Sequence, residues 1–136
     1  MKIDEITGAI VESAMKIHSI LGPGLLESVY ETCLKHELTK RGLRVQSQTW
    51  LPVIYDGIEI EGGYKIDLLV NDEVVVELKT VEHLLALHQA QLLSYLKLSH
   101  KRVGLLMNFN VVHLRDGVKR MVNNYISSAS SASSAV

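Results

Sequence analysis

Two carboxylates and one ammonium group occupy apolar, strand-like segments in which charged residues are not expected. Asp67 lies in one such segment, and Glu77 and Lys79 lie in the next. If the turn between them is centred on Asp72, Asp67 lies opposite Glu77, with the two Cβ atoms roughly 5 Å apart on one face of the sheet. Lys79, two residues beyond Glu77, points to the same face. The spacing therefore predicts a cluster of two acids and one base.

Two carboxylates at this separation repel each other unless a cation or a proton lies between them. Hard oxygen ligands suit Mg²⁺ or Mn²⁺, and the backbone carbonyl of Leu78 could supply a further ligand. Lys79 would then contact the attacking water or the phosphate, which completes the parts needed for metal-assisted phosphodiester hydrolysis. The alternative is a solvent-facing salt bridge at the end of a hairpin. A register shifted by one residue would place the two acids on opposite faces.

Helical spacing predicts two helices before these strands. The first runs from a cap at Asp4 to Leu21, where Gly22-Pro23-Gly24 ends it. Its apolar stripe is expected to be Ile6, Ile10, Ala14, Ile17 and Leu21. The second helix is predicted over 25–42. Its inward face is expected to be Leu26, Val29, Tyr30, Cys33, Leu34 and Leu38, with Cys33 buried as a small hydrophobic residue.

Alternation and turn residues predict strands over the following segment. The expected elements are strands over 45–55, 58–70 (broken or bulged at Gly62-Gly63) and 73–79, a helix over 84–98, a strand over 103–109, and a short hairpin over 112–122. This order predicts an α/β domain in which helices pack on one sheet. Trp50 is expected to pack in the core or at an interface.

The composition indicates one globular domain of ordinary character. The chain has 136 residues, 47% hydrophobic and 21% charged, which predicts a single domain over residues 1–126 and a disordered Ser/Ala-rich tail over 127–136. The formal net charge is −1, so binding of nucleic acid would require a local basic patch or a homodimer that joins two patches. The single cysteine and the absence of a signal peptide or long apolar stretch favour a cytoplasmic protein without membrane contact.

The motifs together resemble the PD-(D/E)xK nuclease superfamily. Asp67 followed by Glu77-Leu78-Lys79 is similar to its catalytic motif, with Ile66 where the superfamily's name has proline. The segment 24–30 resembles the Gly-x-x-Glu-x-x-Tyr signature of the GxxExxY group, and the segment 91–95 resembles the Gln-x-x-x-Tyr motif of RecB-like nucleases. The resemblance implies a restriction-endonuclease-like core of helix, three-strand meander, helix and strand, here with an extra N-terminal helix.

The resemblance also implies roles for individual residues. Asp67 and Glu77 would be metal ligands with the Leu78 carbonyl, Lys79 the catalytic lysine, and Glu27 a helix-borne acid that supplements the Mg²⁺ or Mn²⁺ site. The residues implied to contact the substrate are Gln91, Tyr95 and Tyr30. The activity implied is metal-dependent hydrolysis of nucleic acid, with DNA favoured over RNA. Two alternatives remain: a non-catalytic module on the same fold that binds nucleic acid or protein, and a structural dimer unit whose hairpin charges are only salt bridges.

Overall fold

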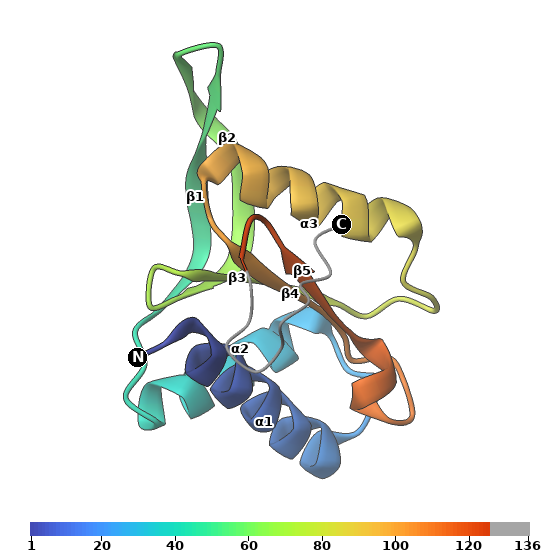
Figure 1. The fold of residues 1–136 in the computed structure, drawn as a ribbon. Helices are drawn as coiled ribbons and strands as arrows, with labels where there is room; N and C mark the ends of the chain where they lie inside the picture. The colour runs from blue at the N-terminus through green and yellow to red at the C-terminus, as the bar shows by residue number, and fades with distance from the viewer. Residues whose placement is uncertain (126–136) are drawn as a thin grey trace.

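A five-stranded sheet forms the centre of the protein, with helices on both faces (Figure 1). The computed structural model describes residues 1–125. The elements in chain order are α1 (Ile3–Leu21), α2 (Glu27–Lys40), β1 (Val45–Tyr55), β2 (Ile58–Val70), β3 (Val74–Lys79), α3 (Ala86–Ser99), β4 (Val103–Asn108), a 3₁₀ turn (Leu114–Gly117) and β5 (Val118–Val122). Helices α1 and α2 cover one face of the sheet and α3 covers the other. The predicted α/β class and order of core elements are confirmed.

The strands lie in the order β1-β2-β3-β4-β5. The pairs β1–β2, β2–β3 and β4–β5 are antiparallel, whereas β3 and β4 are parallel. A parallel pair requires a crossover connection, and α3 provides it. Both β3 and β4 therefore end at the same edge of the sheet, beside the point where α3 begins.

The sheet separates two hydrophobic cores, and β3 contributes to both. Val74, Val76 and Leu78 pack in the core under α1 and α2, while Val75 packs in the core under α3. A strand buried on both faces reads as a continuous apolar run, as the sequence of β3 does up to Val76. Glu77 interrupts that run on the face that α3 covers, because it follows Val75 by two residues.

Several predicted details of the helices are wrong. Helix α1 begins at Ile3 with Lys2 in the cap position, and Asp4 lies inside the first turn, where it bonds to Arg120 at 2.8 Å. Helix α2 begins at Glu27 rather than near residue 25. Of the predicted inward residues, Leu21, Leu26 and Val29 are exposed and Cys33 is only partly buried. The two helices carry more apolar side chains than their contacts with the rest of the protein can bury.

The predicted hairpin over 112–122 is also wrong. The first half of that segment forms the 3₁₀ turn, and only β5 is a strand, which pairs with β4 so that Val122 lies opposite Val103. Gly117 makes this arrangement possible, since a Cβ atom there would overlap the carbonyl oxygen of Asn108. The turn residues Asp116-Gly117 thus lead into β5, which pairs with β4 and not with the residues directly before the turn.

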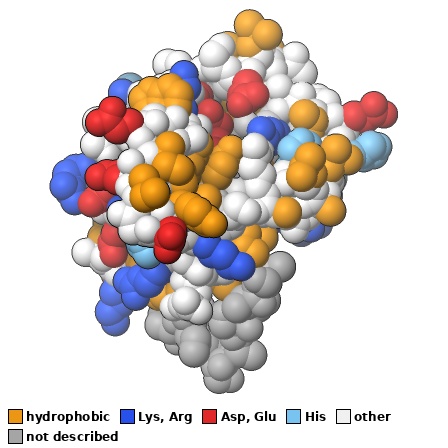
Figure 2. Space-filling view, turned by 90° about the horizontal axis from the view of Figure 1, so that it is seen from above, with side chains coloured by type: hydrophobic (Ala, Val, Ile, Leu, Met, Phe, Trp, Pro, Cys, Tyr) orange, Lys and Arg blue, Asp and Glu red, His pale blue; other side chains and the backbone are white. Residues whose placement is uncertain are grey.

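The β1–β2 hairpin extends beyond the rest of the sheet (Figure 1). The predicted irregularity at Gly62-Gly63 is confirmed, because the register shifts opposite it between Leu51 and Val53. Seen from the end at which this hairpin projects, hydrophobic side chains are gathered on the surface (Figure 2). Trp50 is 59% exposed, so it does not pack in the core; Lys65 lies over its ring at 5.7 Å.

Residues 127–136 of the predicted tail lie outside the described residues, as does residue 126 at the predicted domain boundary. None of the helices within residues 1–125 has both the length and the apolar character needed to cross a bilayer.

Gly117 and Gly8 give opposite predictions for substitution by alanine. Gly117→Ala is expected to lower the free energy of unfolding by about 1–3 kcal/mol, because the backbone carbonyl of Asn108 must move. Gly8→Ala, within α1 and with open space around it, is expected to raise it by about 0.5–1 kcal/mol. Urea unfolding of both variants tests this, and equal effects of the two would contradict it.

Candidate active site

One cavity of about 200 Å³ brings together most of the residues predicted to do chemistry. It lies between the start of α2, the middle of β2, the end of β3, and α3. The predicted site residues that line it are Glu27, Asp67, Glu77, Lys79, Gln91 and Tyr95. It is also lined by Lys65, His88, Leu92 and Leu106. Glu27 and Tyr95 are 68 positions apart in the chain, yet both line this small polar cavity.

The register of β2 and β3 accounts for the meeting of the two acids. Val70 pairs with Val74 and Leu68 with Val76, so the next position aligns Asp67 with Glu77. This is the register predicted from a turn centred on Asp72, and the shifted register that would separate the acids does not occur. Lys79 follows Glu77 by two residues, so it points to the same face of the sheet, and it lines the same cavity.

Both oxygens of Asp67 accept hydrogen bonds from neighbouring strands. The backbone N–H of Leu78 donates to Oδ2 at 2.8 Å, and the side-chain amide of Gln48 donates to Oδ1 at 3.3 Å. Because β1 and β3 both contribute a donor, the carboxylate is held from two sides. The side chain of Leu78 is buried in the core, so only its backbone takes part in the site.

Burial and the neighbouring carboxylate shift the pKa of Glu77 strongly upward. Burial is the larger cause and the negative charge of Asp67 the next; together they raise the pKa to about 9 despite the opposing effect of Lys79. The pKa of Glu27 is also raised, by burial and then by Asp67, with Lys79 again opposing. Without a cation, Glu77 therefore holds a proton at neutral pH.

The donor set fits Mg²⁺ or Mn²⁺ bound mainly by two carboxylates. Within residues 1–125, no group of three or more His, Cys, Asp or Glu side chains is arranged as a metal site. Mg²⁺ needs no such group, since it keeps several waters and uses one or two carboxylates with substrate phosphates. The negative charge of Asp67 adds to the effect of burial on the pKa of Glu77, and a divalent ion would oppose both effects.

Helix α3 presents His88, Gln91 and Tyr95 to the cavity at intervals of one turn. Tyr95 stacks on Tyr64 with ring centroids 3.8 Å apart, and the Tyr64 hydroxyl donates to the Tyr95 carbonyl at 2.6 Å. These contacts fix the helix against β2. His88 accepts a hydrogen bond from the Leu85 N–H at 3.0 Å, so this ring stabilises the start of α3.

Comparison with known proteins identifies the family of this chain. The sequence profile of the PD-(D/E)XK nuclease superfamily matches residues 4–121. The chain belongs to the PD-(D/E)XK nuclease superfamily. Neither the curated proteins nor the solved structures that were compared include a match. The five-stranded sheet and its helices agree with the restriction-endonuclease-like fold of PD-(D/E)XK proteins, which generally depend on divalent metal ions.

Tyr30 does not reach the cavity of this PD-(D/E)XK protein, although it was predicted to contact substrate. Its side chain is fully buried and stacks on Phe109 with centroids 4.4 Å apart. Its hydroxyl donates to the Gly22 carbonyl at 2.6 Å and accepts from the Leu25 N–H at 3.1 Å. Tyr30 therefore fixes the loop that leads to Glu27.

Three polar residues near the PD-(D/E)XK motif were not identified from the sequence. Lys65 lines the cavity, and Gln48 and Glu31 are hydrogen-bonded to each other next to Asp67. Lys65 lies two residues before Asp67 on the same predicted strand, and this spacing could have indicated that it lies near the site. Glu31 follows Glu27 by four residues, a spacing that could have indicated it, whereas no spacing indicated Gln48, which reaches Asp67 from β1.

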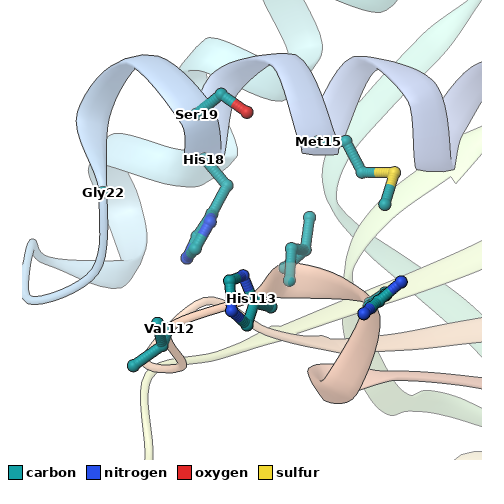
Figure 3. Close-up of a pocket in the computed structure, with 8 residues that line it drawn as sticks. Met15, His18, Ser19, Gly22, Val112 and His113 are labelled. Atoms are coloured by element: carbon teal, nitrogen blue, oxygen red, sulfur yellow. The ribbon is translucent and has the colours of Figure 1, made fainter.

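A second and larger cavity, of about 430 Å³, lies away from the PD-(D/E)XK motif between the end of α1 and the loop after β4 (Figure 3). His18 and His113 line it from these two sides. The His18 ring nitrogen Nε2 lies 3.2 Å from the Phe109 carbonyl and 2.9 Å from the Val111 carbonyl, so it holds the loop to α1. This cavity contains none of the predicted site residues.

Glu77→Gln is expected to stabilise the metal-free PD-(D/E)XK protein increasingly as the pH rises. The pKa of Glu77 is raised from 4.5 to about 9 in the folded state, so the wild-type stability contributed by its proton is complete below pH 4.5 and is lost as the pH approaches 9. At pH 8 with a chelator, the variant should be more stable by up to about 5 kcal/mol, since the wild type loses about 1.4 kcal/mol for each pH unit above 4.5, and near pH 4.5 by little. Urea unfolding at both pH values measures this. A gain that is equal at the two values would contradict the pKa assignment.

Tyr30→Phe is expected to lower stability without affecting nucleic-acid binding. Loss of the two hydroxyl hydrogen bonds should reduce the free energy of unfolding by about 1–2 kcal/mol. Tyr55→Phe, at a 69% exposed position on the hairpin, is the matched control and should leave stability unchanged. A Tyr30→Phe variant that keeps wild-type stability but loses affinity for DNA would show that Tyr30 does contact the substrate.

Proposed function

We propose that the protein is a metal-dependent nuclease that hydrolyses phosphodiester bonds, with DNA as its substrate rather than RNA. The observation that carries this proposal is the alignment of Asp67 with Glu77 beside Lys79 in a cavity lined by α3. Asp67, Glu77 and the Leu78 carbonyl would hold Mg²⁺ or Mn²⁺, and Glu27 would supplement them from α2. A bound divalent ion would supply positive charge for the phosphate and lower the pKa of a coordinated water.

The remaining residues act on the substrate through their charge and shape. Lys79 is partly buried, so its ammonium group can contact the attacking water or a phosphate oxygen with little competition from solvent. Lys65 adds a second positive charge at the same cavity. Gln91, which is exposed, and Tyr95 offer an amide and an aromatic ring to the nucleotide from α3.

We further propose that the chain belongs to the GxxExxY group within the superfamily. Gly24, Glu27 and Tyr30 have the spacing of that signature, and each has a separate structural role. Gly24 adopts a φ of +95°, which favours glycine, in the loop before α2. Glu27 lines the cavity, and Tyr30 holds the loop that precedes it.

The proposal predicts that purified protein cleaves nucleic acid only with Mg²⁺ or Mn²⁺ present. Asp67→Ala and Lys79→Ala should each reduce the cleavage rate by at least about a hundredfold, because one removes a ligand and the other the cation beside it. The assay uses single-stranded, duplex and branched DNA together with RNA, each with metal and with chelator. Asp72→Asn on the same hairpin and Lys119→Ala on β5 are matched controls expected to retain full activity.

Two outcomes would count against the nuclease proposal. Absence of cleavage of every substrate with either metal would favour the alternative, a non-catalytic module that binds nucleic acid or protein. The hydrophobic side chains exposed on the β1–β2 hairpin, such as Tyr55 and Ile58, give that alternative a surface for a protein partner. Activity that persists in both variants would identify a contaminating nuclease. The homodimer and the cytoplasmic location stay predictions, and light scattering tests the former.

A further inference from the structure

Gln48 has a backbone conformation that is unusual for a residue in the middle of a strand. Its φ is +49°, in the left-handed region that side chains other than glycine rarely adopt. The ladder between β1 and β2 is regular on both sides, with Ser47 opposite Leu68 and Thr49 opposite Ile66, so Gln48 aligns with Asp67. Strain of this kind persists where surrounding contacts enforce it, and such positions are concentrated at functional sites.

Both strands change the face they present at this pair. On β2, Ile66 packs in the core under α3, whereas Leu68 packs in the core under α1 and α2. On β1, Val45 packs against the core under α1 and α2, whereas Leu51 lies in the core under α3. Residues two apart in a regular strand share a face, so the strands turn over at Gln48 and Asp67. Because of this change of face, Asp67 lies on the same face of the sheet as Leu69, which is the face that the cavity occupies.

The Gln48 side chain connects two carboxylates. Its amide nitrogen Nε2 donates to Oε1 of Glu31 at 2.6 Å and to Oδ1 of Asp67 at 3.3 Å. Only the nitrogen end of the amide can face two carboxylates, so the orientation of the group is determined by its partners. Glu31 lies one turn after Glu27 on the same face of α2.

We propose that Gln48 is a positioning residue for Asp67, and that Glu31 acts by holding Gln48. With Leu78 N–H on Oδ2 and Gln48 on Oδ1, the Asp67 carboxylate has one orientation, and each oxygen retains a lone pair for a cation. The strained backbone of Gln48 brings its amide to this place, and Glu31 keeps it there from the helix that carries Glu27. The effect on cleavage rests on the proposed function, whereas the effect on the carboxylate does not.

Substitution of Gln48 by glycine separates positioning from a role in folding. Gln48→Gly removes the amide and at the same time relieves the positive φ, whereas Gln46→Gly, at an exposed position two residues earlier on β1, removes a glutamine with no such φ. The affinity for Mn²⁺ alone, measured by calorimetry, should fall about tenfold in Gln48→Gly and not change in Gln46→Gly. The midpoint of urea unfolding without metal should fall less in Gln48→Gly than in Gln46→Gly. Wild-type Mn²⁺ affinity in Gln48→Gly would overturn the proposal.

A double variant tests the part assigned to Glu31. Glu31→Ala should weaken Mn²⁺ binding, and adding it to Gln48→Gly should cause little further loss if Glu31 acts through Gln48. Losses that multiply in full would show that Glu31 acts on the metal directly, which would overturn its assignment here. Glu37→Ala, further along α2 and paired with Lys16 rather than with the site, is the control and should leave Mn²⁺ binding unchanged.

A measurement without metal keeps this inference separate from the nuclease proposal. Hydrogen exchange of the Leu78 amide reports its bond to Asp67, and it should be faster in Gln48→Gly than in the wild type and in Gln46→Gly. Unchanged exchange would overturn the positioning role. A wild-type protein that binds no Mn²⁺ and cleaves nothing, yet shows this pattern of exchange, would refute the nuclease proposal and leave the role of Gln48 intact.

Discussion

The repulsion between Asp67 and Glu77 is the constraint on which the site depends. Two carboxylates from neighbouring strands are aligned on one face of the sheet, and Glu77 avoids a second buried negative charge by retaining its proton. A hairpin that served only stability would gain by placing apolar residues at both positions, as it does at Leu68 and Val76. The pair therefore carries an energetic cost that the fold itself does not require, as sites for cations do.

The surrounding structure prevents the two acids from separating. The β3 strand is buried on both faces and paired on both sides, so it cannot shift without disturbing two cores. Beyond Lys79, its end is held to β4: the Phe109 N–H donates to the Lys79 carbonyl at 2.9 Å. The buried side chain of Asn108 makes two bonds to the backbone of Val81, at 3.1 Å and 2.8 Å. Lys79 thus projects from a backbone whose course is determined on both sides.

Local pattern was enough to predict the features that depend on one strand or one turn. The two-residue period placed Glu77 and Lys79 together, and the turn at Asp72 placed Asp67 opposite them. The errors arose where distant contacts decide. Tyr30 has the right spacing to face the cavity with Glu27, yet its ring fills the core against Phe109, which is 79 positions later in the chain. Gln48 could not be identified because neither its backbone conformation nor its two partners are encoded by neighbouring residues.

The charge of the cavity explains why a cation would precede the substrate. The chain has a formal net charge of −1, and the acids Glu27, Glu31, Asp67 and Glu77 lie close enough for one or more of their charges to raise the pKa values of others. A phosphodiester that enters this space without a cation meets carboxylates, and Lys65 and Lys79 offset part of their charge at the cavity. A divalent ion would displace the proton of Glu77 and reverse the local balance of charge. Binding of a polyanion by a protein without net positive charge is then an effect of the site rather than of the whole surface.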